Sequence, residues 1–341
     1  MELAERPLAL TLGDPAGIGP DTTLLAYGAR SRDPIPAFVL LGDEAVLAAR
    51  AEALGLSVTI ATVSSASEAG GVFGDALPVL PVKVPCPVVA GRPDVAAMPA
   101  VKQSIERAVS LAQRGDVRAV VTNPVAKSLL YQAGFEFPGH TEYLAALAAD
   151  SDAPLPVMML VAGPFKVVPV TIHIPLKDVP SVLTQDLLLK TIEITDQDLR
   201  RFFGYVRPRL AIAGLNPHAG EDGSLGREEI DVIEPAIAAA REKGFDVSGP
   251  YPADTLFHTA ARERYDAALC MYHDQALVPF KTLAFEEGVN VTLGLPFVRT
   301  SPDHGTAFDI AGTGEANPSS LIEALRLADA MSRTAEDEAK A

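Results

Sequence analysis

The chain has 341 residues, of which 48% are hydrophobic and 21% are charged, a composition typical of folded globular proteins. A chain of this length is expected to form about two domains. The formal net charge of −16 argues against a nucleic-acid partner and against an anionic membrane surface, because both are bound by positively charged patches. A local cationic pocket for a small anion remains compatible with this charge.

The cysteine content and the N-terminal segment favour a cytoplasmic protein. The two cysteines, Cys86 and Cys270, are too few for a disulfide framework, which is typical of a reducing compartment. The N-terminus is acidic and has only a brief apolar run, unlike a signal peptide. No apolar run reaches the ~18 residues that a membrane-spanning helix needs, so we expect no membrane segment.

Strand and helix patterns alternate through the first part of the chain. Apolar runs of strand length end at turn residues, and the helical patterns end before a glycine. The segment from residue 64 to residue 99 is rich in Ser, Gly and Pro and is predicted to be mostly irregular. The patterns predict strands at residues 7–12, 37–41, 57–63, 78–84 and 118–122, and helices at residues 43–54 and 100–114.

The alternation continues in the second part of the chain. Two apolar runs, 157–161 and 166–172, are separated by a short turn and predict a β-hairpin. A helical pattern over 228–243 contains Pro235, which predicts a kink or two short helices. Further patterns predict a helix at residues 185–203 and strands at residues 209–213, 267–270 and 289–295.

The C-terminal residues predict a capped helix. Ser320 and Glu323 have the spacing of a capping box, in which each side chain satisfies a backbone N–H of the first turn. We therefore predict a last helix over residues 321–331. The charged residues that follow, 332–341, are predicted to form a frayed tail.

Strands that alternate with helices favour an α/β protein with α/β/α layers around a largely parallel sheet. The hairpin adds some antiparallel pairing. No low-complexity linker separates two domains, so we expect them to be intertwined, with the chain crossing between them more than once. We place one domain at residues 1–125 plus 286–341 and the other at residues 126–285.

Three histidines each follow a predicted strand: His173, His218 and His273. If these strands share a sheet, three imidazoles can meet at one edge, and three neutral imidazoles with an open fourth position make a catalytic zinc-type site. Asp274 and Asp222 lie close in sequence and are candidates to orient the imidazole N–H groups. The alternative is that each histidine only caps a loop by hydrogen bonding.

Several polar residues suit a phosphate or a carboxylate. Lys281 and Arg299 can neutralise such an anion, and Arg299 follows an apolar run at an expected strand end. His140 and Thr141 begin a predicted helix, where backbone N–H groups favour an anion. Asp254 is either an acid/base group or a cap. The alternatives are a solvated charge for Lys281 and an ordinary helix cap for Thr141.

The chain resembles the 4-hydroxythreonine-4-phosphate dehydrogenase family of pyridoxal phosphate biosynthesis. The matching strings run from near the N-terminus to the last helix, and they are GDPAGIGPD, PGHTEYLA, GLNPHAGEDG, GREEID, GPYPADTLF, MYHDQAL and VNVTLGLPFVRTSPDHGTAFDIAGTG. The resemblance implies an isocitrate/isopropylmalate dehydrogenase-like fold, with the active site in the cleft between two domains and at the interface of a homodimer. Because the site is shared, the three histidines need not come from one subunit.

The resemblance also implies residue roles. His173, His218 and His273 are expected to bind a divalent metal, zinc above all, with magnesium or cobalt as alternatives. The substrate-binding positions are expected at His140, Thr141, Lys281, Asn290 and Arg299, and the proton relay at His140 or Asp254.

The string DHGTAFDIAGTGEANP is similar to the adenosine-binding loop of the isopropylmalate and isocitrate dehydrogenases. This similarity indicates a site for NAD or NADP in the domain of residues 1–125 plus 286–341. The metal ligands and the dimer interface then fall to residues 126–285. The expected cofactor-binding residues are His304, Gly305, Asp309 and Asn317.

The implied reaction is the oxidation of 4-phosphooxy-L-threonine at C3, with hydride transfer to NAD(P) and loss of carbon dioxide from the resulting β-keto acid. The nearest alternative is a related dehydrogenase that acts on phosphorylated threonate or erythronate, or on a carboxylated cyclohexadiene diol. Alternatives from other classes are a metal-dependent phosphatase and a non-catalytic protein that binds a phosphorylated metabolite.

Overall fold

The computed structural model describes residues 6–137, 139–149 and 154–340, and the side chains of His140, Ala339 and Lys340 fall outside that description. The chain divides into two compact units, Met1–Pro156 with Leu295–Ala341, and Val157–Gly294. These boundaries lie later in the chain than the predicted ones at 125/126 and 285/286. The reason on the N-terminal side is that the helices after residue 126 contribute Leu130 and Leu144 to the core of the first unit.

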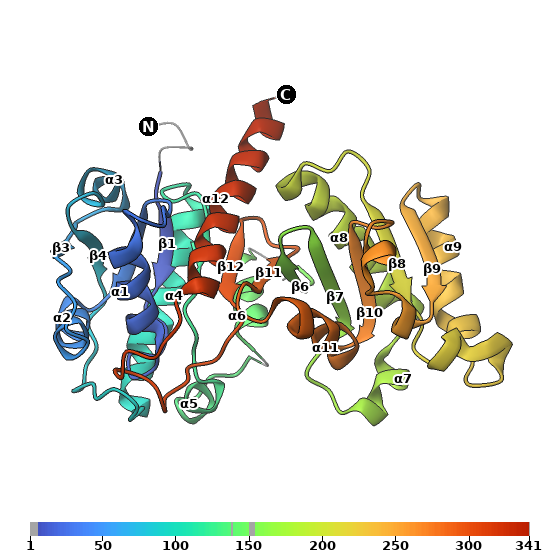
Figure 1. Cartoon of the computed structure of the whole chain (residues 1–341), viewed down its shortest axis with the longest axis horizontal. Helices are drawn as coiled ribbons and strands as arrows, with labels where there is room; N and C mark the ends of the chain where they lie inside the picture. Colours follow the sequence, from blue (N-terminus) through green and yellow to red (C-terminus); the bar gives the residue numbers. More distant parts are fainter. Residues whose placement is uncertain (1–5, 138, 150–153, 341) are drawn as a thin grey trace. The chain divides into compact units, whose positions relative to one another are not determined.

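The first unit is built on a parallel sheet whose strand order is β3-β4-β2-β1-β5-β12 (Figure 1). β1 lies in the middle of this sheet, and all four of its side chains are buried. The first five strands overlap the predicted apolar runs, whereas β12 was not predicted as a strand. The strands are β1 (Leu8–Thr11), β2 (Phe38–Gly42), β3 (Ile60–Thr62), β4 (Leu77–Pro81), β5 (Val120–Val121) and β12 (Arg299–Pro302).

Helices cover both faces of the first sheet. The amphipathic helix α4 (Met98–Gln113) buries Val101, Ile105 and Ala108 in the same core cluster as Ala9 of β1. α12 (Ser319–Lys340) packs along β12 and beside α1, on the other face (Figure 1). The remaining helices are α1 (Gly19–Ala29), α2 (Glu44–Ala53), α3 (Ala69–Val72), α5 (Lys127–Gln132) and α6 (His140–Ala148).

The second unit has a mixed sheet of order β11-β6-β7-β10-β8-β9 (Figure 1). The predicted hairpin is confirmed, because β6 pairs with β7 in the antiparallel sense. β7, β10, β8 and β9 are parallel to one another. The strands are β6 (Val157–Ala162), β7 (Phe165–Thr171), β8 (Arg209–Ala213), β9 (Asp246–Tyr251), β10 (Ala267–Tyr272) and β11 (Val289–Leu293).

Helices also cover both faces of the second sheet. α11 buries Ala276, Leu277 and Phe280 in the core cluster of one face, and the long helix α8 packs on α9 on the other. The predicted interruption near Pro235 is confirmed, because one π-helical turn, η6, precedes α9. These elements are α7 (Val179–Val182), α8 (Gln185–Phe203), η6 (Glu229–Ile233), α9 (Glu234–Glu242), α10 (Thr259–Arg262) and α11 (His273–Ala284).

Two predictions about the C-terminal helix are wrong. α12 continues to Lys340, so residues 332–340 are helical rather than frayed, and the Arg333–Asp329 ion pair supports this extension. Ser320 lies inside the helix, where its hydroxyl accepts the backbone N–H of Asp303. The side chain of Asn317 accepts the N–H of Ser319 at 3.0 Å and is therefore the cap. Among the described residues, no helix has the length and apolarity to cross a membrane.

Asp198 of α8 is a buried carboxylate in the second unit. It accepts the backbone N–H of Gly294, which follows β11, at 2.6 Å. Burial raises the pKa of Asp198 from 3.8 to about 6, because the charged form loses its water. The folded protein therefore holds this proton more tightly than the unfolded chain does.

A pH dependence of stability follows from Asp198. A carboxyl whose folded pKa is raised contributes stability below about pH 4 that is lost as the pH rises through about 6. We expect Asp198→Asn to remove this loss, so that its unfolding free energy in urea rises relative to the wild type between these pH values. Asp186→Asn, at an exposed position of the same helix, is the control. Parallel pH profiles for the wild type and Asp198→Asn would contradict the prediction.

Candidate functional site

The three histidines predicted as metal ligands follow three neighbouring strands of the second unit. β10 pairs in parallel with β7 on one side and with β8 on the other, so their carboxyl ends lie at one edge of the sheet. His173 follows β7, His273 follows β10 directly, and His218 lies in the turn η5 (Pro217–Gly223) after β8. Ligands of α/β proteins bind at this edge.

Two of these histidines lie together. The ring centroids of His173 and His273 are 5.7 Å apart, and both rings line a hollow of about 220 Å³. His218 does not join them in a tight group, since no three His, Cys, Asp or Glu side chains in residues 6–137, 139–149 and 154–340 are close enough to hold an ion. The hollow is also lined by Thr171, Ile172, Ile174, Leu176, Val179, Tyr272 and Asp274.

The paired imidazoles fit a divalent transition-metal ion. Two imidazoles that share one tetrahedral zinc through bonds of about 2.0–2.1 Å have centroids roughly 5 Å apart, close to the spacing of His173 and His273. The Nδ1 of His273 lies 2.7 Å from Oδ1 of Asp274, which the sequence suggested as an orienting carboxylate. A carboxylate that accepts Nδ1–H leaves the Nε2 lone pair of the ring available to a metal.

Two of the histidines have an unusual backbone. His173 has φ of 51° and His218 has φ of 52°, in the left-handed region that non-glycine residues seldom adopt. His218 begins a run of six residues with positive φ that ends at Gly223. Residues held in such conformations gather at functional sites, where the surrounding structure determines them. The conformation therefore supports a functional role for these turns.

Two buried side chains tie the ends of β7, β10 and β8 together, and we call Thr171 and Gln275 the strand-end clamp. The Thr171 hydroxyl donates to the carbonyl of Met271 at 2.7 Å. The Gln275 side chain accepts the N–H of Met271 and donates to the carbonyl of Gly214, both at 2.7 Å. The clamp thus links the backbone just before each of the three histidines.

The other predicted site residues of the second unit lie on separate elements. Asp254 is exposed in the turn η7 (Ala253–Thr255), which is in contact with the turn that carries His218. Lys281 lies on α11 with its ammonium 5.8 Å from the centroid of the Phe285 ring. Asn290 is in β11, and its side-chain oxygen is buried without a hydrogen-bond donor in the described structure. An acceptor of this kind is suited to a ligand that donates.

The first unit holds the remaining substrate residues. His140 is the first residue of α6, followed by the half-buried Thr141. Arg299 is the first residue of β12 rather than the residue after a strand, and its side chain is buried. It donates to the hydroxyl of Thr122 at 2.6 Å. Burial lowers the pKa of Arg299 to about 10, which leaves it a cation at neutral pH.

The predicted cofactor loop is joined to the N-terminal glycine-rich turn within the first unit. The N–H of Ile18 donates to the carbonyl of Thr306 at 2.9 Å, and the N–H of Gly312 donates to Asp21 at 2.7 Å. Asp21 is itself ion-paired with Arg50, and both side chains are buried. Asp309 is exposed, His304 and Gly305 begin the loop, and Asn317 caps α12.

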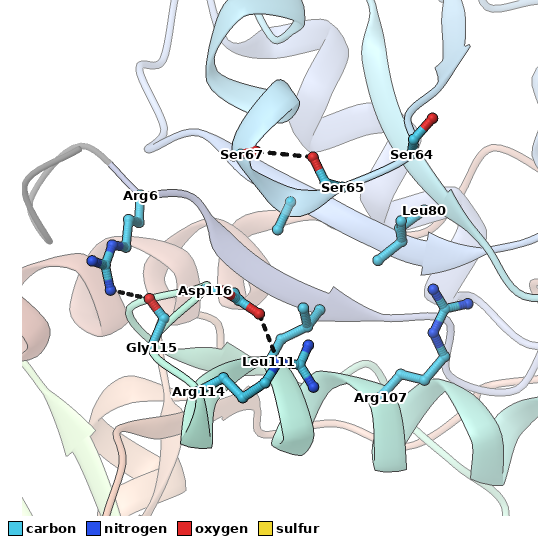
Figure 2. A pocket seen from close by; sticks show the side chains of 11 residues that line it. Arg6, Ser64, Ser65, Ser67, Leu80, Arg107, Leu111, Arg114, Gly115 and Asp116 are labelled. Carbon is cyan, nitrogen blue, oxygen red and sulfur yellow. Dashed lines mark hydrogen bonds and ion pairs between the residues drawn. The ribbon is translucent and has the colours of Figure 1, made fainter.

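The first unit has a hollow of its own, of about 450 Å³. Its cationic lining includes Arg6, Arg107 and Arg114 (Figure 2). Each of these guanidinium groups already has a partner in the protein. Arg6 donates to the carbonyl of Gly115, Arg107 to a carbonyl of β4, and Arg114 to Asp116. None of the predicted site residues lines this hollow, so we interpret its arginines as structural.

Sequence reasoning found the histidines but gave no role to the residues that hold their turns. Gln275 lies inside the quoted string MYHDQAL. Glu229, whose carboxylate accepts the backbone N–H of Asn216 in the turn of His218, lies inside GREEID. In the sequence, Gln275 is recognisable only as a polar residue just after a predicted buried strand. A polar residue at that place is equally expected on the protein surface. Only the hydrogen bonds distinguish the two cases.

Comparison with known proteins gives a consistent result. Residues 35–328 match the family described as pyridoxal phosphate biosynthetic protein PdxA. The 4-hydroxythreonine-4-phosphate dehydrogenase of Bradyrhizobium diazoefficiens is 57% identical, over 96% of this chain and 97% of its own.

Two solved structures are also similar. The 4-hydroxythreonine-4-phosphate dehydrogenase from Klebsiella pneumoniae superposes with a TM-score of 0.84 at 38% identity, covering 96% of this chain and 99% of that one. A terephthalate 1,2-cis-dihydrodiol dehydrogenase from Burkholderia xenovorans has a TM-score of 0.63 at 28% identity, covering 95% and 98%. The α/β fold expected from the sequence is thus confirmed.

The strand-end clamp predicts a specific cost for removing Gln275. Gln275→Leu leaves the buried Met271 N–H and Gly214 carbonyl without their side-chain partner, at about 1–3 kcal/mol for each group. We expect the unfolding free energy, measured in urea, to fall by roughly 2–6 kcal/mol. Gln113→Leu, at an exposed glutamine of α4, should change it by less than about 0.5 kcal/mol. Equal stability of Gln275→Leu and the wild type would contradict the role of the clamp.

Proposed function

This chain belongs to the PdxA family of pyridoxal phosphate biosynthetic proteins, and we propose that it is a 4-hydroxythreonine-4-phosphate dehydrogenase. The reaction is the NAD(P)-linked oxidation of 4-phosphooxy-L-threonine at C3 to 2-amino-3-oxo-4-(phosphooxy)butanoate. This β-keto acid then loses carbon dioxide to give 3-amino-2-oxopropyl phosphate. The observation that carries the proposal is the pair of imidazoles, 5.7 Å apart, at adjacent strand ends of a chain with this family membership.

His173, His218 and His273 would hold a divalent ion, for which zinc is the first choice and magnesium or cobalt the alternatives. When bound, such an ion supplies positive charge that stabilises a developing alkoxide. The imidazoles need to be neutral to act as ligands, and Asp274 orients the ring of His273 by accepting from it. The third ligand comes from the turn after β8, in the same subunit or in a partner, because the family implies a homodimer with a shared site.

The anionic groups of the substrate need cations and donors. Arg299 is a buried guanidinium, which binds a phosphate or carboxylate strongly because little water competes. Lys281 adds a second positive charge, and Asn290 and Thr141 add polar contacts. His140 would contact the substrate at the start of α6, where backbone N–H groups favour an anion.

The hydroxyl proton has to leave while the hydride passes to the cofactor. Asp254 is suited to accept it, because it is exposed in a turn that contacts the turn of His218. His140 is the alternative acceptor. When bound, NAD or NADP takes the hydride, and His304, Gly305, Asp309 and Asn317 would hold its adenosine half. The N–H of Gly312 donates to Asp21, which is ion-paired with Arg50. These contacts keep the loop of residues 304–317 ordered for binding.

The alternatives have less support. The dihydrodiol dehydrogenase is 28% identical to this chain, whereas the relatives named for the phosphorylated substrate are 38% and 57% identical. A phosphatase would not need the loop at residues 304–317. The two unpaired cysteines, Cys86 and Cys270, are typical of a reducing compartment and support a cytoplasmic enzyme.

To test the proposal, 4-phosphooxy-L-threonine is added to metal-stripped enzyme that has been supplied with zinc, magnesium or cobalt. The measurement is the absorbance of the reduced nicotinamide cofactor. We expect turnover only with a divalent ion, and the comparison of NAD with NADP identifies the cofactor. His218→Ala should lose at least about 100-fold in kcat/KM and lose bound metal while its circular dichroism stays unchanged. His258→Ala, an exposed histidine of the same unit, should retain both.

Three results would contradict the proposal. They are full turnover by metal-free enzyme, faster turnover of phosphorylated threonate than of phosphorylated threonine, and release of inorganic phosphate without any nicotinamide cofactor.

A further inference from the structure

We propose that Glu229, acting through Asn216, is a positioning residue for His218 and thereby sets the metal affinity of the site. The proposal rests on the proposed function, since it concerns the same metal site. It assigns Glu229 no contact with the substrate or the ion. The role of Glu229 is to hold the backbone from which His218 projects.

The turn that carries His218 needs an external support. Residues 218–222 all have positive φ, and four of the five are not glycine. A left-handed conformation costs a non-glycine residue roughly 1–2 kcal/mol, so this run is several kcal/mol above a relaxed backbone. Its own backbone hydrogen bonds include Leu225 N–H to the carbonyl of Gly220 and Ser224 N–H to the carbonyl of Glu221, both at 3.0 Å. Such a segment keeps one shape only where its surroundings over-determine it.

Glu229 supplies that support from the inside of the turn. Its side chain is 2% exposed, and one carboxylate oxygen accepts the backbone N–H of Asn216 at 2.8 Å. The other oxygen accepts the side-chain amide of Asn216 at 2.9 Å. The same amide also donates to Glu228 at 2.7 Å, which lowers the pKa of Glu228. Asn216 lies two residues before His218, so both of its bonds set the direction in which the turn leaves β8.

The neighbouring glycines show how closely the turn is fitted around Glu229. A Cβ atom on Gly220 would lie 2.7 Å from one carboxylate oxygen, and one on Gly214 would lie 3.0 Å from the other. A Cβ on Gly226 would lie 2.2 Å from the side-chain nitrogen of Asn216. These distances leave no room for a side chain, so the backbone closes on the carboxylate at Gly220 and Gly214 and on the Asn216 amide at Gly226.

A purely structural role would not call for a carboxylate here. In the described residues Glu229 forms no ion pair, and its acceptors are met by neutral N–H groups. Burying a charge without a cation is costly compared with burying an apolar side chain of similar size. Glu229 also opens the π-helical turn η6, a conformation that is rare and concentrated at functional sites. Both features favour selection for the position of His218 over selection for stability.

The experiment measures metal affinity directly. Zinc is titrated by calorimetry into the metal-stripped full chain as wild type, Glu229→Gln, Asn216→Ala and Glu234→Gln. Glu229→Gln keeps the size of the side chain but presents an amide N–H to the donating amide of Asn216. We expect zinc to bind 10–100-fold more weakly, the loss found when groups behind metal ligands are replaced. Glu234→Gln makes the same charge change at an exposed position of α9 and should stay within about twofold of the wild type.

Asn216→Ala tests the same contact from its other side. It removes the side-chain amide but keeps the backbone N–H, so we expect a smaller loss of zinc affinity, about 3–10-fold. If Glu229→Gln does not fold, Asn216→Ala decides the matter. Wild-type zinc affinity in a folded Glu229→Gln, even with a lowered melting temperature, overturns the proposal, because the carboxylate would then only stabilise the fold.

The titrations separate the failure of this proposal from the failure of the proposed function. If His218→Ala binds zinc as tightly as the wild type, His218 is not a ligand and the proposed metal site itself is wrong. If His218→Ala loses zinc while Glu229→Gln and Asn216→Ala do not, the metal site stands and the positioning role of Glu229 is wrong. Loss in all three variants, with Glu234→Gln unaffected, is the expected result.

Discussion

The candidate site depends on buried side chains that hydrogen-bond to backbone at the carboxyl ends of β7, β10 and β8. Main-chain pairing fixes neighbouring strands only up to their last residues, and the segments beyond are free to move unless something else holds them. In this protein Thr171 and Gln275 extend the connection past the strand ends. The turns that carry His173 and His218, and the helix α11 that begins at His273, therefore start from a fixed frame.

The first unit uses a different device for the same purpose. Its loops are joined by the buried ion pair of Asp21 with Arg50, which also binds the N–H of Gly312. The guanidinium donates in addition to the carbonyls of Pro15 and Gly17. A buried pair that satisfies this many backbone groups gives specificity of loop conformation rather than net stability. In both units, therefore, polar side chains whose burial costs free energy are found beside loops that have to keep a single conformation.

Most of the fold could be predicted from the sequence, because the apolar runs are short, clear and bounded by turn residues. β8 and α8 have the predicted limits, and the hairpin of β6 and β7 is present. The failures occur where local pattern and long-range contact disagree. Ser320 and Glu323 have the spacing of a capping box, but Ser320 accepts from Asp303, a contact that no local pattern contains.

The site was predictable in part for a similar reason. A histidine after an apolar run marks a strand end, so His173, His218 and His273 could be placed at one edge of a sheet from the sequence. The position of β10 between β7 and β8 could not be predicted, because strand order depends on pairing between segments that are distant in the sequence. The left-handed backbone at His218 was also hidden, since only Gly220 and Gly223 of its turn are residues that favour positive φ.

The cost of the left-handed turns explains why the polar network is buried behind the histidines rather than exposed around them. A histidine on a regular helix or strand points where the element dictates, whereas one on a left-handed residue can be aimed independently, provided that the turn is held. Exposed hydrogen bonds would hold it weakly, since water competes for both partners. Bonds made in the interior, as by Glu229 and Gln275, hold it strongly, but each leaves a costly unpaired group when broken. The polarity of this interior is therefore the physical consequence of aiming the imidazoles of His173 and His218 from turns instead of from regular elements.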